Sequence, residues 1–363
     1  MNVRRHLLAG HVIPAHPLAL TPSRTLDERA QRAVTRYYVH AGAGGIAVGV
    51  HTTQFAIHRP EIGLYRPVLE LAAETARAWL AYVRGDGEPD TLQPFALVAG
   101  LVGDTRQAVH EAEVARAVGY HAGLLSLGGV DGPLGDITDA ALVRHARAVS
   151  EVLPLVGFYL QPAVGGRPLG YRFWRALAEE VPNLVAIKIA PFDRYRTLDV
   201  VRAIAESGRV DVALYTGNDD SIVVDLLTPF PVTVGGMPAT RRIVGGLLGQ
   251  WAVWTRRAVE LLADAHAAAA AGQPIDARWL AHAAALTDAN GALFDPHNGY
   301  AGCIAGIHEV LRRQGLVRGT WTLDPREQLS PGQAQEIDRV LRLYPDLTDD
   351  AFVAQHRDAW LAD

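Results

Sequence analysis

Short apolar runs alternate with longer amphipathic stretches over about the first two thirds of the chain. The runs are almost continuously apolar, which is typical of strands that are buried on both faces of a parallel sheet. The stretches between them have the spacing of helices that bury one face. Eight strands are predicted, at residues 10–20, 45–51, 94–101, 121–127, 155–160, 184–189, 211–216 and 231–235.

A helix is predicted after each strand, and the first begins at a capping box, Thr25-Leu26-Asp27-Glu28. Eight strand–helix units favour a (β/α)8 TIM barrel over an open doubly wound sheet, which usually has five or six strands. No strand pattern follows residue 240, and helices are predicted at 240–271, 276–293, 301–314, 331–343 and 348–361. We therefore predict an α/β barrel domain at 1–239 and a C-terminal helical region at 240–363.

The charge balance and the single cysteine exclude several classes of protein. The chain has 34 Lys+Arg against 39 Asp+Glu, a net charge of −5, so it lacks the basic surface of a nucleic-acid binder. Cys303 is alone and can form neither an internal disulfide nor a thiolate metal cluster. The sequence shows no run of about 18 apolar residues for a membrane span and no secretory signal at its start. A cytoplasmic location is expected.

One lysine, Lys188, stands among 33 arginines. Genome base composition explains the arginines, and chance could leave one lysine, so the surroundings of Lys188 must decide its meaning. Arginine cannot lose a proton near neutral pH and attack a carbonyl group as a free amine, whereas lysine can. Lys188 lies near the end of the sixth predicted strand, where the chemistry of such barrels is located.

Two residues at neighbouring strand ends are the main catalytic candidates. A lysine that faces the apolar lumen would have a lowered pKa and would be available as a nucleophile; the alternative is a structural lysine paired with a buried carboxylate. Tyr159, near the end of the fifth strand, could act as a general acid or base beside Lys188. Its alternative role is that of an ordinary tyrosine at the barrel rim.

Five motifs in order give the chain a resemblance to the dihydrodipicolinate synthase / N-acetylneuraminate lyase family of class I aldolases. Their positions are 159–163 (YLQPA, like Y-N-x-P-x), 186–190 (AIKIA, like G-x-K-E/D-x), 215–220 (YTGNDD, like S-G-x-D-D), 234–237 (VGGM, like the Gly-rich end of strand eight) and 298–316. The resemblance implies that Lys188 forms an imine with pyruvate or a related 2-oxo acid and that Tyr159 transfers protons. It also implies lyase or aldolase activity without a cofactor, and a homo-oligomer, since much of the family is tetrameric.

The resemblance extends to the residues that would hold the substrate. Residues 50–54 (VHTTQ) stand where the family has G-T-T-G-E, so Thr52 and Thr53 are expected to bind the substrate carboxylate. His51 replaces the threonine that relays protons in the family, and it either takes over that role or packs against the rim. Gly235, at the end of the eighth predicted strand, is expected to line the site.

Departures from the family pattern argue against true dihydrodipicolinate synthase activity. Residues 126–130 lack the second tyrosine, and Val164 stands where synthase members have an arginine for the second substrate. Aldol cleavage or condensation is the leading interpretation; the alternatives are a 2-oxo sugar-acid dehydratase, an aromatic-aldehyde aldolase and a non-catalytic barrel that binds a small ligand. No H-x-H or H-E-x-x-H motif indicates a metal site. Packing roles are favoured for His16 and Cys303, and helix capping for Asp219 and Asp220.

Overall fold

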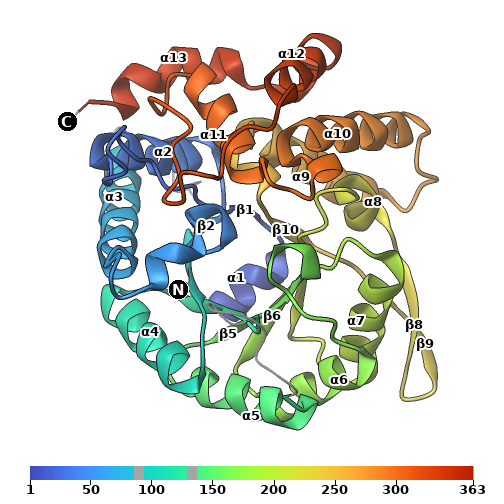
Figure 1. Ribbon diagram of the computed structural model, residues 1–363. Coiled ribbons are helices and arrows are strands. Elements are labelled where there is room, and N and C mark those ends of the chain that lie inside the picture. The colour runs from blue at the N-terminus through green and yellow to red at the C-terminus, as the bar shows by residue number, and fades with distance from the viewer. Residues whose placement is uncertain (86–93, 129–136, 363) are drawn as a thin grey trace.

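The computed structural model describes residues 1–85, 94–128 and 137–362, and a barrel of eight parallel strands forms its centre (Figure 1). Neighbouring strands pair in the order β1-β10-β7-β6-β5-β4-β3-β2, and a parallel bridge from Ala15 to Ala47 joins the two ends of the series. The predicted (β/α)8 fold class is thus confirmed. The barrel strands are β1 (Val12–Pro14), β2 (Gly45–Val48), β3 (Ala96–Leu101), β4 (Ala122–Ser126), β5 (Leu155–Leu160), β6 (Leu184–Ala190), β7 (Ala213–Thr216) and β10 (Gly245–Leu248).

Helices surround the barrel and pack on the outward-facing side chains of its strands (Figure 1). The helix expected to start at the Thr25 capping box begins three residues later, at Glu28, because Asp27 is its N-cap and accepts a hydrogen bond from the Ala30 N–H. The surrounding helices are α2 (Glu28–Ala41), α3 (Tyr65–Gly85), α4 (Thr105–Val118), α5 (Asp139–Ser150), α6 (Tyr171–Glu180), α7 (Arg194–Glu206) and α8 (Ile222–Leu227).

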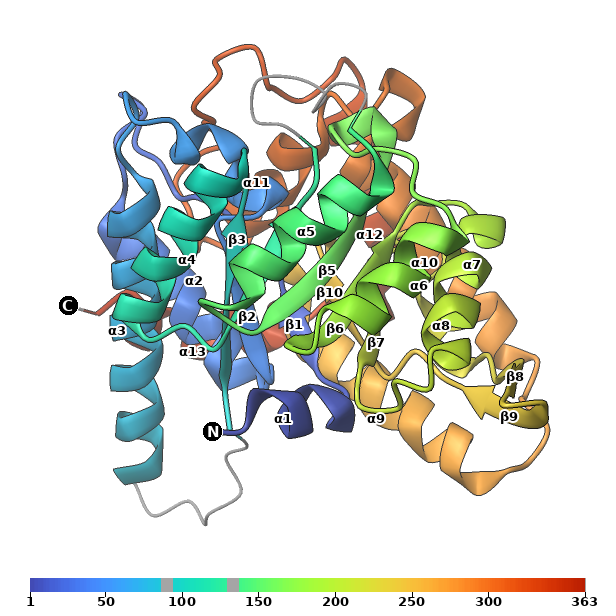
Figure 2. The same ribbon diagram turned by 90° about the horizontal axis from the view of Figure 1, so that it is seen from below.

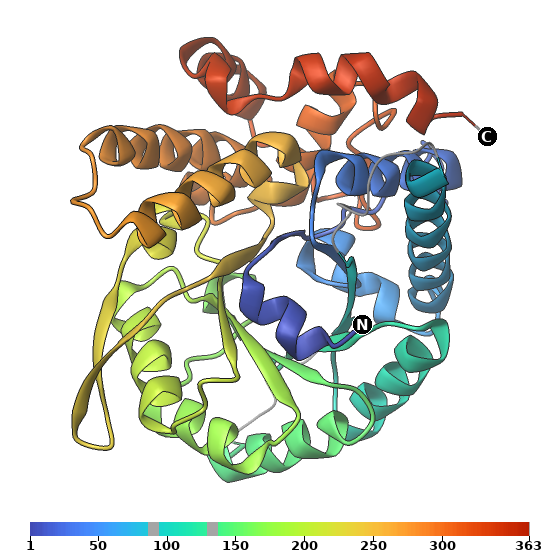
Figure 3. The ribbon, with the colours of Figure 1, turned by 180° about the vertical axis from the view of Figure 1, so that it is seen from behind.

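A short helix, α1 (Val3–Ala9), lies across the amino ends of the barrel strands (Figure 3). Leu7 joins the apolar cluster in the lumen, and its carbonyl accepts a 2.9 Å hydrogen bond from the Tyr215 hydroxyl. His6 Nε2 lies 2.8 Å from the carbonyl oxygen of Gly44, directly before β2. Figure 2 shows α1 beneath the strands. The helix therefore covers this end of the barrel, opposite the carboxyl ends of the strands.

The eighth barrel strand is not where the sequence analysis placed it. Residues 231–235 fall in an antiparallel hairpin outside the barrel, formed by β8 (Phe230–Val234) and β9 (Met237–Arg241). Burial alternates along β8, as in a strand with one exposed face. The barrel is closed instead by β10, so it extends beyond residue 239.

Gly235 was expected at the substrate site, and this expectation is wrong. Gly235 and Gly236 form the two-residue turn of the β8–β9 hairpin, with φ of 57° and 83°. Two successive positive φ angles are those of the type I′ turn that suits a tight hairpin. The role of Gly235 is therefore conformational, and it lies outside the lumen.

The C-terminal helices pack along one side of the barrel (Figure 1). The first of them starts at Thr255 and not near 240, since β10 occupies part of the predicted range. Tyr37 of α2 anchors them: its hydroxyl donates to Asp349 and accepts from the Thr255 N–H, both at 2.7 Å. None of the described helices has the length and apolarity needed to span a bilayer. The helices are α9 (Thr255–Ala271), α10 (Arg278–Phe294), α11 (Cys303–Arg313), α12 (Gln333–Leu343) and α13 (Asp350–Trp360).

Candidate active site

Lys188 lies inside the barrel near the carboxyl end of β6. Ala186 and Ala190 of this strand belong to the apolar cluster in the lumen. Ile187 and Ile189 instead pack against the surrounding helices. Because side chains alternate between the two faces of a strand, Lys188 points into the lumen with the two alanines. Only 7% of its surface is exposed.

The Lys188 side chain is held between an aromatic ring and a stretch of bare backbone. Phe158 of β5 is its strand partner, and Nζ lies 4.5 Å from the centroid of the Phe158 ring. On the other side, a Cβ added at Gly217 would lie 2.7 Å from Cε of Lys188, so only glycine leaves room for the amine there. Burial lowers the pKa of Lys188 to about 8, and the negative charge of Asp219 opposes that shift. The free amine is thus far more accessible near neutral pH than in an ordinary lysine.

Asp219 follows β7 and faces the same cavity. Its Oδ1 accepts a 3.0 Å hydrogen bond from the Gln250 N–H, and its backbone carbonyl accepts one from the Asn290 side chain. Burial raises the pKa of Asp219 to about 7, although the Gln250 N–H and the charge of Lys188 act in the opposite direction. The expected helix-capping role is not seen, because α8 has Ser221 at its N-cap position. Asp219 is therefore a titratable group of the cavity.

Tyr159 does not face Lys188. Along β5 the side chain of Phe158 is in the lumen, and Tyr159 points outward into the helical layer. Its ring packs on Trp174, with centroids 5.3 Å apart. Its hydroxyl accepts hydrogen bonds from the Leu169 N–H at 3.2 Å and from Arg196 at 3.0 Å. The contacts of Tyr159 are therefore those of a buried structural residue on the far side of the strand.

His51 and Thr52 lie where they were expected, at the rim beyond β2. Both line the cavity, from a single turn of 3-10 helix, η1 (His51–Thr53). Burial, with a further contribution from the charge of Lys188, lowers the pKa of His51 to about 4, so its imidazole is neutral at neutral pH. Thr52 is 3% exposed and lines the same cavity.

Thr53 belongs to the frame of the rim and not to the cavity wall. Its hydroxyl donates a 2.6 Å hydrogen bond to the carbonyl of His16 and accepts from the N–H groups of Gly49 and Val50. His16 is itself fully buried, and its Nε2 is bonded to Thr35. These contacts hold the β1 and β2 ends together and leave no hydroxyl of Thr53 for a substrate.

The C-terminal region supplies a wall of the cavity that the sequence analysis missed. Phe294, Tyr300 and Cys303 all line it, although they follow the last barrel strand along the chain. Tyr300 makes an edge contact with Phe192, with ring centroids 6.0 Å apart. Tyr300 and Cys303 fall within the fifth motif, at 298–316, but that motif does not indicate a contact with Lys188, because the contact depends on how α10 and α11 fold back over the barrel.

The cavity has an inner and an outer part. The inner part, around Lys188, encloses about 50 Å³. His51, Val164 and Tyr300 also line an outer cavity of about 610 Å³. A molecule bound at Lys188 would therefore place only a few atoms in the inner part and extend past these three side chains. Of residues 126–130, which lack the second tyrosine of the synthase members, 129–130 lie outside the described residues.

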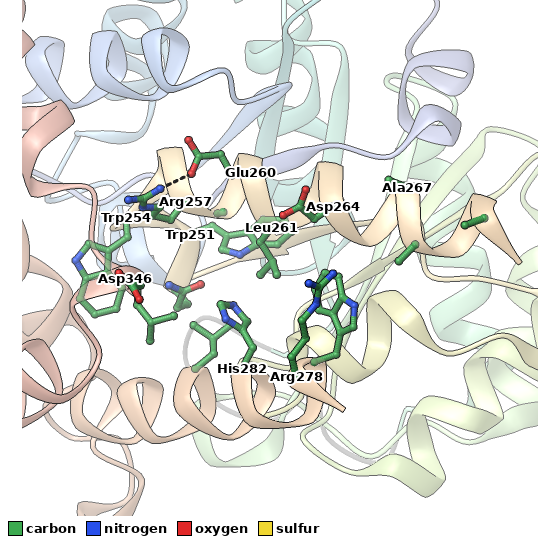
Figure 4. Close-up of a pocket in the computed structure, with 17 residues that line it drawn as sticks. Trp251, Trp254, Arg257, Glu260, Leu261, Asp264, Ala267, Arg278, His282 and Asp346 are labelled. Carbon is green, nitrogen blue, oxygen red and sulfur yellow. Dashed lines mark hydrogen bonds and ion pairs between the residues drawn. The ribbon is translucent and has the colours of Figure 1, made fainter. Parts of the chain in front are cut away.

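A larger groove, of about 690 Å³, lies between α9 and α10 (Figure 4). Its walls carry Trp251, Arg278 and His282, and an ion pair of 2.7 Å between Arg257 and Glu260. It shares no lining residue with the cavity around Lys188. The groove has no nucleophile comparable to Lys188, so the cavity inside the barrel is the stronger candidate for a catalytic site.

Comparison with known proteins shows the fold. No family model matches the sequence, and no curated protein matches it. Among solved structures, dihydrodipicolinate synthase from Aquifex aeolicus is similar, with a TM-score of 0.70, 19% identity, and 94% of this chain and 99% of that chain covered. A prophage protein of the dihydrodipicolinic acid synthase family from E. coli K12, solved in complex with pyruvate, has a TM-score of 0.68 and 18% identity, with 94% of this chain and 99% of that chain covered. N-acetylneuraminate lyase from Fusobacterium nucleatum has a TM-score of 0.68 and 14% identity, with 93% of this chain and 99% of that chain covered. The chain thus has the fold of these enzymes.

Proposed function

We propose that this chain is a class I (Schiff-base) lyase in which Lys188 forms an imine with a 2-oxo acid such as pyruvate. The observation that carries the proposal is the position of the chain's single lysine, which is buried in the lumen at the carboxyl end of β6 with a lowered pKa. Barrel enzymes have their chemistry at this end. The likeness in fold to dihydrodipicolinate synthase and to a related protein solved with pyruvate adds support.

The chemistry follows from a free amine in an apolar lumen. Nζ of Lys188 attacks the keto carbon of the 2-oxo acid, and loss of one water gives the protonated imine. When the 2-oxo acid carries a hydroxyl group on its fourth carbon, a base takes the hydroxyl proton and the C–O bond becomes the carbonyl group of an aldehyde. The electron pair of the bond between the third and fourth carbons then passes to the protonated imine, which becomes an enamine. A proton then adds to the third carbon, and water hydrolyses the imine to free pyruvate and Lys188. The reverse sequence is a condensation. We assign the Thr52 hydroxyl to the substrate carboxylate.

The inner cavity receives only the 2-oxo acid end of the substrate, and its walls include Phe158, Leu160, Phe192 and Phe294. The rest of the substrate extends into the outer cavity, whose lining includes polar and charged side chains: Gln54, Arg59, Asp324, Arg326 and Glu327. A sugar acid needs a hydrogen-bond partner for each buried hydroxyl, and the outer cavity has such partners. Both alternatives within this chemistry, a sugar-acid dehydratase and an aromatic-aldehyde aldolase, are therefore retained.

Trapping of the imine tests the proposal directly. The protein is incubated with pyruvate, reduced with borohydride and weighed intact. Lys188 and the α-amino group are the only aliphatic primary amines of the chain, so Lys188→Arg controls for the terminus. We expect one reduced pyruvyl group on the wild type and none on the variant. The kind of aldehyde released from a panel of aromatic and sugar-derived aldols would then identify the substrate class.

A barrel that binds a small ligand without turnover is the contrasting possibility. It would give no adduct with pyruvate or with other 2-oxo acids, and Lys188→Arg would keep its affinity for the ligand. Either result would refute the Schiff-base proposal.

A further inference from the structure

The proposed chemistry needs a group that moves protons, and the residue expected for this task faces away from Lys188. Tyr159 is outside the lumen, and the side chain that takes the lumen position beside Lys188 is Phe158. A phenyl ring has no exchangeable proton. Another group in the cavity must therefore remove the proton from the third carbon of the imine and return it.

Among the described residues, three titratable side chains besides Lys188 bring an oxygen or nitrogen atom to the cavity: His51, Asp219 and Tyr300. Burial lowers the pKa of His51 to about 4, which makes its imidazole a weak base. Tyr300 also lines the outer cavity, and burial raises the pKa of its phenol above the ordinary value, which makes it a weaker acid than a free tyrosine. A general acid–base catalyst works best when its pKa is near the operating pH, and burial brings the carboxyl group of Asp219 into that range.

The backbone places Asp219 next to the amine. It comes two residues after Gly217, the position at which an added Cβ would lie 2.7 Å from Cε and 3.1 Å from Cγ of Lys188. The Gln250 N–H fixes Oδ1. Asp219 is thus anchored through one carboxylate oxygen in the wall of the cavity.

We propose that Asp219 is the proton-transfer residue of this site, in place of a tyrosine in the lumen; the inference rests on the proposed imine at Lys188. With pyruvate, the Asp219 carboxylate takes one proton from the methyl carbon of the protonated imine. The electron pair of that C–H bond forms the C=C bond of the enamine, and the π pair of the C=N bond moves to nitrogen. In aldol cleavage the carboxylate takes the hydroxyl proton as the C–C bond breaks, and the resulting acid returns it to the enamine carbon.

Asp219→Asn separates the proton transfer from imine formation. An amide cannot take up the proton, so exchange of the pyruvate methyl protons with D2O, followed by NMR, should fall by ~100-fold or more, the contribution expected of a general base. Borohydride trapping should remain, because the Asp219 charge raises the pKa of Lys188 and its loss leaves more free amine. Asp358→Asn, at an aspartate of α13 whose side chain is 90% exposed and that does not line the cavity, is the matched control and should exchange within about two-fold of the wild type.

Two further readouts exclude a merely structural effect. Asp219→Glu restores the carboxylate and should recover part of the exchange. With imine formation saturated by pyruvate, the wild-type exchange rate should rise with pH through the titration of Asp219 near pH 7, and this transition should be absent in Asp219→Asn. The groups that face Asp219 and shape this transition are Lys188, Asp220, Tyr300 and Cys303.

The outcomes distinguish this inference from the proposed function. Trapping in both proteins with exchange lost only in Asp219→Asn supports Asp219. Trapping in both with equal exchange rates overturns the role of Asp219 and leaves the imine chemistry standing. Absence of trapping in the wild type overturns the proposed function and the inference together.

Discussion

Tyr159→Phe tests whether β5 has the orientation described above, because the family motif and the structure assign opposite roles to this hydroxyl. The motif makes it a proton carrier in the lumen. The structure makes it an acceptor for the Leu169 N–H and for Arg196 in the helical layer. The substitution removes one oxygen and keeps the ring on Trp174.

The size of the effect follows from the two donors that lose their partner. Leu169 is 4% exposed, so its N–H would be left unpaired in a buried place, at a cost of about 1–3 kcal/mol. The Arg196 side chain is 39% exposed and can turn to water, so its contribution is small. The free energy of unfolding should therefore fall by about 1–3 kcal/mol.

Urea denaturation gives the stability change, and the same protein is used for borohydride trapping and for methyl-proton exchange of pyruvate. We expect the variant to be destabilised but to trap pyruvate and exchange protons at the wild-type rate under folding conditions. Unchanged stability together with a loss of exchange of 100-fold or more would refute the outward orientation of Tyr159 and return the proton-transfer role to it.

Two other predictions concern packing and pH. Gly217→Ala should abolish trapping, because the new methyl group would lie 2.7 Å from both Lys188 Cε and Ala190 Cβ. Gly291→Ala, where α10 has open space for a methyl group, is the control: it should trap pyruvate normally and gain up to ~1 kcal/mol of stability by urea denaturation. Equal trapping in both variants would contradict the packing argument. Burial holds the pKa of His16 at about 4 against 6.5 for the free side chain, so the unfolded chain binds the proton more tightly. The resulting stabilisation is present above pH 6.5 and is lost as pH falls from 6.5 to 4, by about 3 kcal/mol for this residue alone; urea midpoints that stay constant over this range would contradict it.

The sequence was sufficient for the parts of the fold that depend on local pattern. Each of the first seven barrel strands lies at or within one residue of its predicted range. The eighth does not, because its residues have no strand-like pattern. Glycine is required at 245 and 246 because an added Cβ would lie 2.6 Å from the His11 backbone at the first position and 2.6 Å from the Trp251 ring at the second. The requirement is set by neighbours distant in the chain. The more strand-like sequence at β8 forms the outer hairpin.

The site residues were likewise predictable from the sequence only where the signal was local. A strong local signal, one lysine at a strand end, located Lys188, and a rim motif located Thr52. Motif spacing counts residues but does not fix the face on which a side chain lies. The pairing of β5 with β6 is irregular between Leu155 and Val156, and beyond it Phe158 lies opposite Lys188. A shift of one residue moves a side chain to the other face of a strand.

The orientation of β5 can also be tested by placing a phenol in the lumen, with Phe158→Tyr introduced into the Asp219→Asn variant. Phe158 is in the lumen and its ring centroid is 4.5 Å from Nζ of Lys188, so the substitution introduces a phenol beside the imine. If a proton carrier is what the Asp219→Asn variant lacks, the double variant should exchange the methyl protons of pyruvate at least ~10-fold faster than Asp219→Asn alone, since general acid–base catalysis contributes factors of this size or more. Tyr159→Phe in the same double variant should not change the rate, because that hydroxyl lies on the opposite face of β5. A double variant that is folded and traps pyruvate, yet exchanges no faster than Asp219→Asn, would show that a phenol at this position cannot reach the reacting carbon.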